Sequence, residues 1–264
     1  MPTLHGAPAL HGVGVLVTRP EQQAMSLCRL LENQGASTLR LPAIDIKALG
    51  NRRETAARLG RLEDFDVIIF TSANAVRFGA SLLEQRRDLT LAALGPATAR
   101  ALNQSGYRVA VQPESIDSEG LLLHPRLAHP TGRRILIIKG SNGRPFLEQE
   151  LAQRGAQVMT ADVYRRVPAI PSEAALASLL ECFLASALQV ITATSLEIAA
   201  NLLAIAPPAL RAEFERVHWL VPGARVAAGL RELGLSAPLL QAASAEDHDL
   251  VAALLAWRAA ESGA

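Results

Sequence analysis

Short, nearly continuous apolar runs alternate along the chain with longer stretches in which apolar positions recur every three or four residues. Continuous apolar runs are typical of strands covered on both faces, as in a parallel sheet. The longer stretches are typical of helices with one buried face, such as the face shared by Phe146, Leu147 and Leu151. This alternation predicts an α/β fold in which helices connect parallel strands. The predicted strands are residues 13–18, 67–70, 91–94, 134–138, 190–192 and 217–221, and the predicted helices are residues 21–34, 74–85, 97–104, 145–154 and 247–257.

The pattern also repeats, which predicts two domains of similar build. Residues 15–36 match residues 135–156 in their leucine and glycine positions. A second type of segment begins near residue 67 and returns near residue 190, each time with a hydroxyl pair after its first strand. The two types therefore alternate along the chain. The matched positions are Leu16, Leu27, Leu31, Gly35 and Ala36 with Leu136, Leu147, Leu151, Gly155 and Ala156, and Thr71-Ser72 with Thr194-Ser195.

The repeat leaves the pairing of its segments open. Neighbouring segments could form two contiguous halves, or the outer segments could form one discontinuous domain with the inner ones inserted. Each segment of the first type ends in a long β pattern, at residues 37–46 and 157–166. We expect these two strands to cross between the domains.

Composition narrows the class of protein. Half of the 264 residues are hydrophobic and 19% are charged, which excludes an intrinsically disordered chain. The net charge of +1 argues against a dedicated nucleic-acid or anionic-membrane protein, because both usually carry a large basic excess. Cys28 and Cys182 cannot supply a disulfide framework or a zinc ribbon, so a reducing cytoplasm is expected. The N-terminus lacks the pattern of a signal peptide, and no apolar stretch predicts a membrane span.

Glycine or a small hydroxyl residue stands at many junctions between a predicted strand and the next helix. Helix N-termini present free backbone N–H groups and a positive partial charge, which suit an anion. Any one junction is more often an ordinary cap, but seven in a duplicated frame fit a cleft for a ligand with several negative groups. The junctions are Thr18-Arg-Pro20, Thr71-Ser-Ala-Asn74, Gly95-Pro-Ala-Thr98, Ser118-Glu-Gly120, Lys139-Gly-Ser-Asn-Gly-Arg144, Thr194-Ser195 and Gly223-Ala-Arg225.

Basic residues near these junctions are candidates for binding an anion. The best local candidate runs from Lys139 to Arg144, because Gly140 and Gly143 permit close backbone approach. An arginine at a surface junction is more often simply solvated. The other basic residues near junctions or strand ends are Arg19, Arg165, Arg166 and Arg225.

Tyr164 is one of two tyrosines and is followed by two arginines at the end of a predicted crossing strand. A phenol beside two guanidinium groups could donate a proton in catalysis. The simpler interpretation is a tyrosine that packs on the strand surface, since tyrosine favours strands. Spacing alone favours the packing interpretation.

The signatures of several other catalytic classes are absent from the sequence. The chain has no Walker spacing, and Gly12-Val-Gly14 precedes the first strand instead of following it, so no nucleotide fingerprint is present. The six histidines show no metal-ligand spacing, and no Gly-x-Ser-x-Gly elbow occurs. Aromatic residues, at 4%, are too scarce for a base-stacking platform.

Taken in order, the motifs at the junctions resemble those of the uroporphyrinogen-III synthase family. No single motif is specific, but the ordered set spans about residues 13–258, nearly the whole chain. The motifs are Val15-Leu-Val-Thr-Arg-Pro20, Phe70-Thr-Ser-Ala-Asn-Ala-Val76, Gly95-Pro-Ala-Thr98, Ser118-Glu-Gly-Leu121, Lys139-Gly-x-x-Gly-Arg144 and Val163-Tyr-Arg-Arg166.

The resemblance implies two flavodoxin-like α/β domains, each with a parallel sheet, joined by a two-stranded β ladder. It selects the interleaved pairing of the duplicated segments. The expected discontinuous domain is residues 1–40 with 168–264, the inserted domain is residues 47–160, and the linker strands are residues 41–46 and 161–167.

The resemblance also implies a lyase of tetrapyrrole (heme) biosynthesis that uses no metal and no organic cofactor. Its substrate is hydroxymethylbilane, a linear tetrapyrrole with eight carboxylates, received from hydroxymethylbilane synthase. The enzyme closes it to uroporphyrinogen III and inverts ring D through a spiro intermediate. Tyr164 matches the family tyrosine and is expected to assist departure of the hydroxyl. The expected substrate-binding residues are Arg19, Thr71, Ser72, Ala73, Asn74, Thr98, Lys139, Gly140, Arg144, Thr194, Ser195, Gly223 and Arg225.

The second half departs from the family pattern. Ile191-Thr-Ala-Thr-Ser195 stands where Phe-Thr-Ser is usual, and Val226 stands opposite Thr98 in the repeat. Lys139 stands where arginine is also common, which keeps the charge but loses bidentate geometry. The alternative function is a non-enzymatic two-domain binding protein for a small polyanion, and the missing export signal counts against it. We expect a cytoplasmic monomer with no nucleic-acid or membrane partner.

Overall fold

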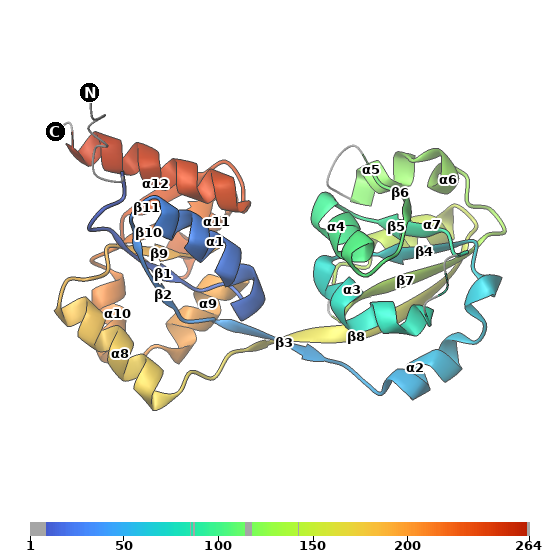
Figure 1. The fold of residues 1–264 in the computed structure, drawn as a ribbon, viewed down its shortest axis with the longest axis horizontal. Helices are drawn as coiled ribbons and strands as arrows, with labels where there is room; N and C mark the ends of the chain where they lie inside the picture. Colours follow the sequence, from blue (N-terminus) through green and yellow to red (C-terminus); the bar gives the residue numbers. More distant parts are fainter. Residues whose placement is uncertain (1–8, 85, 87, 114–117, 142, 263–264) are drawn as a thin grey trace, which may run out of the picture. The chain divides into compact units, whose positions relative to one another are not determined.

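The computed structural model describes residues 9–84, 86, 88–113, 118–141 and 143–262 (Figure 1). Gln85, the expected end of one helix, and Asn142 of the glycine-containing loop lie outside the described residues. Strands and helices alternate, so the expected α/β class is confirmed. Contacts divide the chain into unit 1, Met1–Asp45 with Val167–Ala264, and unit 2, Ile46–Arg166.

Unit 1 is built on a five-stranded sheet in the order β11-β10-β9-β1-β2, and all neighbouring strands are parallel. The crossover helices between parallel strands pack on the faces of the sheet. The strands are β1 (Gly14–Val17), β2 (Ser37–Arg40), β9 (Val190–Thr192), β10 (His218–Pro222) and β11 (Leu239–Ala242), and the helices are α1 (Glu21–Asn33), α8 (Glu173–Leu184), α9 (Leu196–Ile205), α10 (Pro208–Phe214), α11 (Gly223–Glu232) and α12 (Asp247–Ser262).

The second sheet has six strands in the order β3-β8-β7-β4-β5-β6. The pairs from β8 to β6 are parallel, and β3 pairs with the outer side of β8. The strands are β3 (Ile44–Ala48), β4 (Val67–Phe70), β5 (Leu91–Ala93), β6 (Val109–Val111), β7 (Arg134–Gly140) and β8 (Gln157–Pro168), and the helices are α2 (Arg52–Leu59), α3 (Ala73–Gly79), α4 (Pro96–Gln104), α5 (Ser118–Leu123), α6 (Pro125–Ala128) and α7 (Phe146–Gln153).

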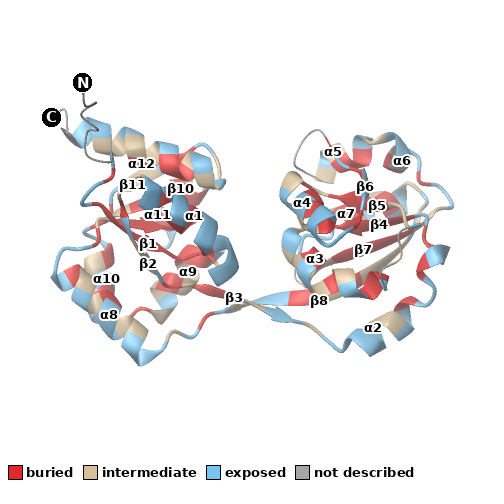
Figure 2. Cartoon of the chain, in the orientation of Figure 1, coloured by how far each residue is buried: buried red, intermediate tan, exposed pale blue. Residues whose placement is uncertain are grey.

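The central strands of unit 2 are buried on both faces (Figure 2). Successive side chains of a strand point to opposite faces. Ile68 of β4 and Leu136 of β7 therefore join one hydrophobic cluster, whereas Ile69 and Ile137 join a second one. Each fully buried aliphatic side chain of this kind contributes roughly 1.5–3 kcal/mol. This double burial explains why these strands are apolar without alternation in the sequence.

Two expected elements differ from the structure. The β pattern at residues 37–46 is not one strand, since β2 ends at Arg40 and β3 begins at Ile44 in the other sheet. Pro42 lies in the gap and has no N–H for a ladder hydrogen bond. The helix expected from residue 74 ends at Gly79 and continues as a tighter 3-10 turn, Ala80–Leu83. Glycine weakens a helix interior by about 1 kcal/mol, which favours an end there.

In the part of the chain that the structure describes, none of the helices has both the length and the apolar character needed to cross a bilayer.

Candidate functional site

The boundary between β4 and β7 is the topological switch point of unit 2. From β4 the chain moves outward through β5 and β6 on one side, and β7 and β8 lie on the other. Loops diverge at the carboxyl end of such a boundary, and ligands of open α/β sheets bind there. The N–H of Thr71, just after β4, donates to the carbonyl of Ile138 in β7 (3.2 Å). This bond holds the loop of residues 71–74 beside the end of β7, where Lys139 and Gly140 lie.

Tyr164 reaches the same place from β8. Its side chain is 5% exposed, and its Oη lies 3.1 Å from Oγ of Ser72. Oγ of Ser72 also accepts the N–H of Ala75 (3.0 Å) and so caps α3. The ring of Phe78 stacks on the ring of Tyr164, with centroids 5.9 Å apart. The sequence predicted Tyr164 and Ser72 as separate site residues, and the structure makes them hydrogen-bonded neighbours.

The cations of the loop after β7 differ in availability. The ammonium of Lys139 pairs with Glu148 of α7, and both side chains are less than one fifth exposed. Asp162 is the register partner of Lys139 on β8, and its buried Oδ1 accepts no hydrogen bond from the described residues. Lys139 thus stands among carboxylates of its own unit, whereas Arg144 is exposed. A ligand carboxylate would compete with Glu148 for Lys139 but would meet Arg144 directly.

Thr98 lies beyond the next strand, β5, on α4. Its side chain is 4% exposed and belongs to the buried face of that helix. Gly95 is the N-cap of α4, and no side chain caps this N-terminus. The first N–H groups of α4 are therefore better placed than the Thr98 hydroxyl to meet a ligand.

Unit 1 has a matching switch point between β1 and β9. The hydroxyl of Thr18, after β1, donates to the carbonyl of Thr192. The guanidinium of Arg19 pairs with Asp247 at the start of α12 and donates to the carbonyl of Ala245. Arg19 is 7% exposed, so its charge is used inside unit 1. Binding of a ligand by Arg19 stays a prediction that requires this ion pair to open.

The loops after β9 and β10 bring the remaining candidates of unit 1 together. Oγ of Ser195 accepts the N–H of Ile198 (3.2 Å) and caps α9, with Thr194 half-buried before it. Gly223 begins α11 with φ of 71°, a conformation that glycine adopts without strain. Arg225 is exposed in the first turn of α11. These two loops are neighbours because β9 and β10 pair.

The candidate residues thus form two groups, one at the carboxyl end of each sheet. The group of unit 2 is Thr71, Ser72, Ala73, Asn74, Thr98, Lys139, Gly140, Arg144 and Tyr164, and the group of unit 1 is Arg19, Thr194, Ser195, Gly223 and Arg225.

Sequence reasoning missed the partners that hold these residues. Phe78, Glu148 and Asp247 were not predicted as part of any site, yet each contacts a candidate. Glu148 and Asp247 lie in the first turns of helices, where acidic residues are common for dipole reasons alone. Because that explanation accounts for both carboxylates, their pairing with Lys139 and Arg19 was not predicted from the sequence. Phe78 carried no signal beyond its position in the helix that Ser72 caps.

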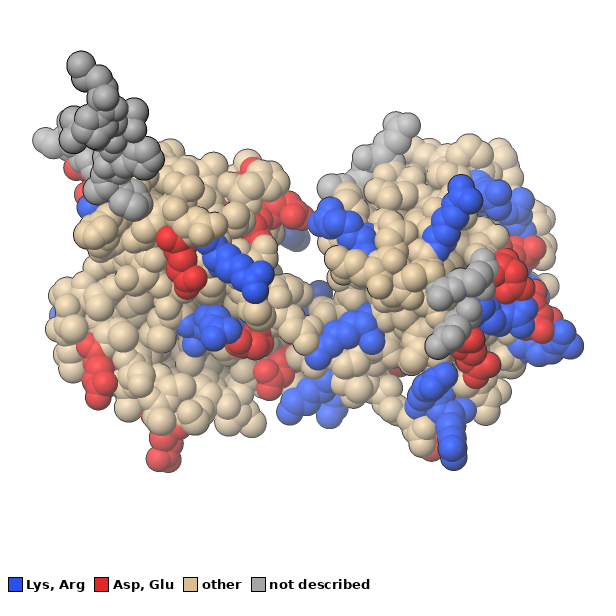
Figure 3. Space-filling model, viewed as in Figure 1, with Lys and Arg blue, Asp and Glu red and all other residues tan. Residues whose placement is uncertain are grey.

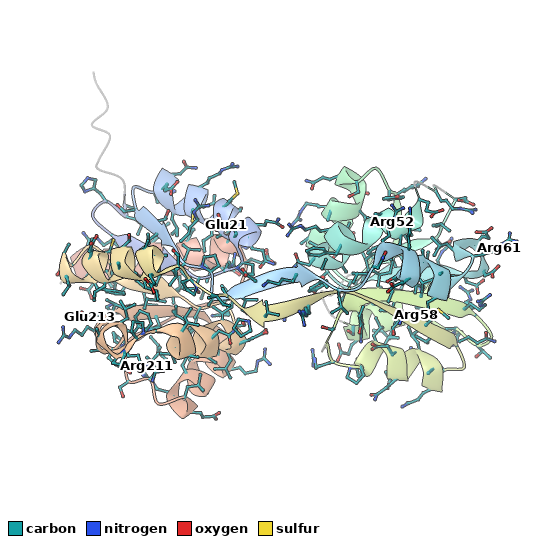
Figure 4. The ribbon with its side chains drawn as sticks, turned by 90° about the horizontal axis from the view of Figure 1, so that it is seen from below. Glu21, Arg52, Arg58, Arg61, Arg211 and Glu213 are labelled. Carbon is teal, nitrogen blue, oxygen red and sulfur yellow. The ribbon has the colours of Figure 1, made fainter. Side chains whose placement is uncertain are left out.

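The two units carry opposite net charge. Unit 2 has 18 Lys and Arg against 12 Asp and Glu, a net +6, and unit 1 has 8 against 13, a net −5, which together give the +1 of the chain. On the face in Figure 3, Lys and Arg gather mainly on unit 2. Arg52, Arg58 and Arg61, labelled in Figure 4, lie on α2 or just after it and belong to this excess. A polyanion is therefore attracted mainly by unit 2.

The resolved pKa shifts lie outside both groups. Burial raises the pKa of the Cys28 thiol, which faces the core from α1. A hydrogen bond from its own backbone, followed by one from Arg61, lowers the pKa of Glu63. A hydrogen bond from Arg86 lowers the pKa of Asp88. Across the described residues, no three His, Cys, Asp or Glu side chains come together as a metal would require.

Known proteins are similar to this chain over most of its length. A sequence model of one family, described as uroporphyrinogen-III synthase HemD, matches residues 26–252. The uroporphyrinogen-III synthase of Escherichia coli K12 is 30% identical over 234 residues, which cover 84% of this chain and 92% of that protein. The one of Salmonella typhimurium is 32% identical over 160 residues, 58% of this chain and 65% of that protein, slightly under two thirds of its length.

A solved structure shows the same fold. The crystal structure of a mutant uroporphyrinogen III synthase from the extremely thermophilic bacterium Thermus thermophilus aligns with a TM-score of 0.57 at 23% identity. The alignment covers 96% of this chain and all of that one. At this identity the likeness concerns the fold alone.

Proposed function

Because the chain belongs to the uroporphyrinogen-III synthase family, we propose that it closes hydroxymethylbilane to uroporphyrinogen III with inversion of ring D. The reaction makes it a lyase, since water leaves as the ring closes. The observation that carries the proposal at the level of chemistry is the Tyr164 hydroxyl, held 3.1 Å from Ser72 at the switch point of unit 2. A proton donor at a ligand-binding crevice is what departure of the substrate hydroxyl requires.

The reaction begins when the ring A hydroxyl accepts a proton and leaves as water. The resulting azafulvene is attacked by the substituted α-carbon of ring D, which gives a spiro intermediate. Fragmentation and reclosure then place ring D in the inverted orientation. Free in solution, the substrate closes directly to the type I isomer, so the enzyme must hold the two ends in the other geometry. Tyr164 supplies the first proton in this proposal.

Substrate carboxylates bind to helix N-termini, hydroxyl groups and a few cations. The positive net charge of unit 2 supports a larger electrostatic contribution from this unit. Arg144 and Arg225 are exposed and can bind a carboxylate without breaking an ion pair that the structure records. The carboxylate contacts extend over the other predicted binding residues of both groups, apart from Ser72 and Gly140 beside Tyr164. Lys139 and Arg19 take part only when their carboxylate partners release them.

We also propose that the protein works in the cytoplasm as a monomer. Hydroxymethylbilane synthase then delivers the unstable linear substrate, since the substrate cyclises when left free. No cofactor is required by the proposed steps, because each uses only proton transfer and the reactivity of the pyrrole rings.

The test supplies hydroxymethylbilane generated enzymatically in place and separates the uroporphyrinogen isomers. The proposal expects the type III isomer to dominate and its fraction to rise with protein concentration. A product that stays type I at high protein concentration would refute it. The alternative, a binding protein for a small polyanion, predicts that result together with tight binding of the linear tetrapyrrole. The family match does not favour this alternative.

A further inference from the structure

Three residues of unit 2, Ser72, Phe78 and Gly140, surround the side chain of Tyr164 and form its packing site. Ser72 contacts its hydroxyl, Phe78 stacks on its ring, and Gly140 lies against its edge. We infer that Ser72 and Gly140 are positioning residues that act through Tyr164, and that neither acts mainly by binding a substrate carboxylate. The inference rests on the proposed function, because it assigns Tyr164 the role of proton donor.

Gly140 gives the ring its space. A Cβ built on Gly140 would lie 2.5 Å from Cζ, 2.7 Å from Cε2 and 2.9 Å from Oη of Tyr164. Gly140 and Tyr164 are also register partners across β7 and β8, directly after a register shift between Lys139 and Gly140. The N–H of Ser141 donates to the carbonyl of Tyr164 (2.8 Å), which fixes both backbones. With the backbones fixed, any side chain at position 140 must displace the phenol ring.

Ser72 sets the direction of the phenol proton. One lone pair of Oγ is already used by the N–H of Ala75. The serine proton remains available, and when Ser72 donates it to Oη, the phenol proton is free to point at the substrate. As Tyr164 transfers that proton to the departing hydroxyl, water leaves and a phenolate forms. Ser72 then stabilises the phenolate by a charge-assisted hydrogen bond. The proton released on ring closure returns to Tyr164, so the cycle balances.

Kinetics of a double-mutant cycle separate positioning from direct binding. Ser72→Ala removes a hydrogen bond to the phenolate, and the usual strength of hydrogen bonds to charged groups corresponds to a loss of about 10-fold to 100-fold in kcat. KM should stay within about threefold, because the lost interaction forms only as the proton is transferred. Ser72→Thr keeps a hydroxyl and should recover most of kcat. In a Tyr164→Phe background, Ser72→Ala should cost less than about twofold more, because the hydroxyl it serves is gone. A rise in KM alone, or equal losses in both backgrounds, would overturn the inference.

Loss of the helix cap needs a control, because Ser72→Ala also removes the cap of α3. Ser172 caps α8 in the same way, by accepting the N–H of Ala175 (3.2 Å), and contacts no tyrosine in the described structure. Ser172→Ala should lower stability by a similar amount and leave kcat unchanged. If Ser172→Ala lowered kcat as strongly as Ser72→Ala, the effect at Ser72 would be one of general stability.

A spectroscopic measurement tests the packing site of Tyr164 without relying on activity. Tyr107 and Tyr164 are the two tyrosines of the chain, so protein labelled with 3-fluorotyrosine has few ¹⁹F NMR signals to assign. Gly140→Ala should shift or broaden the Tyr164 signal and leave that of Tyr107 in place. Gly229→Ala is the matched control, since its Cβ would lie 2.8 Å from Leu196 in unit 1. If the Tyr164 signal did not move in folded Gly140→Ala protein, the claim that Gly140 positions the Tyr164 ring would be refuted.

The isomer assay, the kinetic cycle and the NMR measurement together distinguish a failure of the proposed function from a failure of the positioning role. If wild-type protein yields the type I isomer alone, the proposed function and the catalytic part of this inference both fall. If wild-type protein makes the type III isomer but the cycle with Tyr164→Phe is additive, the function stands and the positioning role is refuted. If Gly140→Ala moves the tyrosine signal and lowers kcat with little change in KM, the inference is supported.

Discussion

The switch points of the two units share a frame but differ in chemistry. Ser72 and Ser195 follow equivalent strands, and each caps the next helix through the same hydrogen bond. Lys139 and Arg19 are 120 residues apart and lie at or just after the carboxyl ends of β7 and β1, and each pairs with a carboxylate. The position that the same offset pairs with Tyr164 is occupied by buried Ile44. The serine caps and the cation positions recur in both copies, although the partner carboxylates lie on non-equivalent helices, and a phenol stands at the switch point in unit 2 alone.

This difference helps to distinguish residues that stabilise the fold from residues that take part in the reaction. Features present in both copies, such as a serine cap and a paired cation, are explained by folding, because each repeated unit needs them. Features found in one copy are the better candidates for function. Tyr164, its packing site and the positive net charge belong to unit 2. We therefore expect mutations in unit 2 to act on turnover and the matching mutations in unit 1 to act on stability.

Tyr164→Phe is expected to have the largest effect. Removal of the phenol proton should lower kcat about 100-fold or more, the usual range for a positioned general acid, while the ring and its packing on Phe78 remain. Kinetics with hydroxymethylbilane and circular dichroism of the same preparation check turnover and fold together. Unchanged kcat would remove Tyr164 from the mechanism and with it the main difference between the units.

Arg19→Met tests the other side of the comparison. It leaves Asp247 without its partner at a largely buried position, which should cost roughly 3 kcal/mol of unfolding free energy. Trp219 and Trp257, the two tryptophans of the chain, both belong to unit 1, so urea denaturation followed by tryptophan fluorescence reports this loss. Adding Asp247→Leu should recover part of the stability. A large rise in KM with stability intact would instead identify Arg19 as a substrate ligand.

The charge difference predicts unequal losses at two exposed arginines. Arg144→Gln in unit 2 should raise KM several-fold, and Arg225→Gln in unit 1 should raise it less, because the net charge around it is negative. Both effects should shrink as salt is raised from about 50 to about 300 mM, since screening weakens exposed charges. Equal effects from both arginines would mean that the net charge of a unit does not guide the substrate.

Cys28 provides the smallest expected effect. Burial raises the pKa of its thiol in the folded protein above the ordinary value of 9.0. Above pH 9 the folded state therefore holds a proton that the unfolded state has released, so stability falls as pH rises. Between about pH 8 and 10.5 the wild type should lose more unfolding free energy than Cys28→Ala, by less than about 1 kcal/mol. Parallel pH curves for the two proteins would contradict this.

Much of the fold could be predicted because double burial leaves a clear trace in the sequence. β4 is apolar throughout, as are residues 135–138 of β7 and 190–191 of β9, and the repeat predicted two similar domains for them. The break between β2 and β3 was missed, since β-favoured residues flank Pro42 on both sides. The domain boundaries at residues 40, 47, 160 and 168 stay a prediction.

The site was predictable as a set of loops but not as a set of contacts. Motifs after strands predicted residues 71–74, Lys139 and Gly140 together, since strand ends meet at one edge of a parallel sheet. The bond between Ser72 and Tyr164 joins residues 92 positions apart and depends on strand order, which no local pattern contains. For the same reason the pairing of Arg19 with Asp247 was not foreseen.

The isomer composition formed by wild-type and Tyr164→Phe protein at equal concentration tests the central claim most directly. The account predicts mainly the type III isomer with the wild type, and type III formation about 100-fold slower with Tyr164→Phe, so that the spontaneous type I isomer takes over. Type I alone from the wild type, or equal rates of type III formation by both proteins, would contradict it.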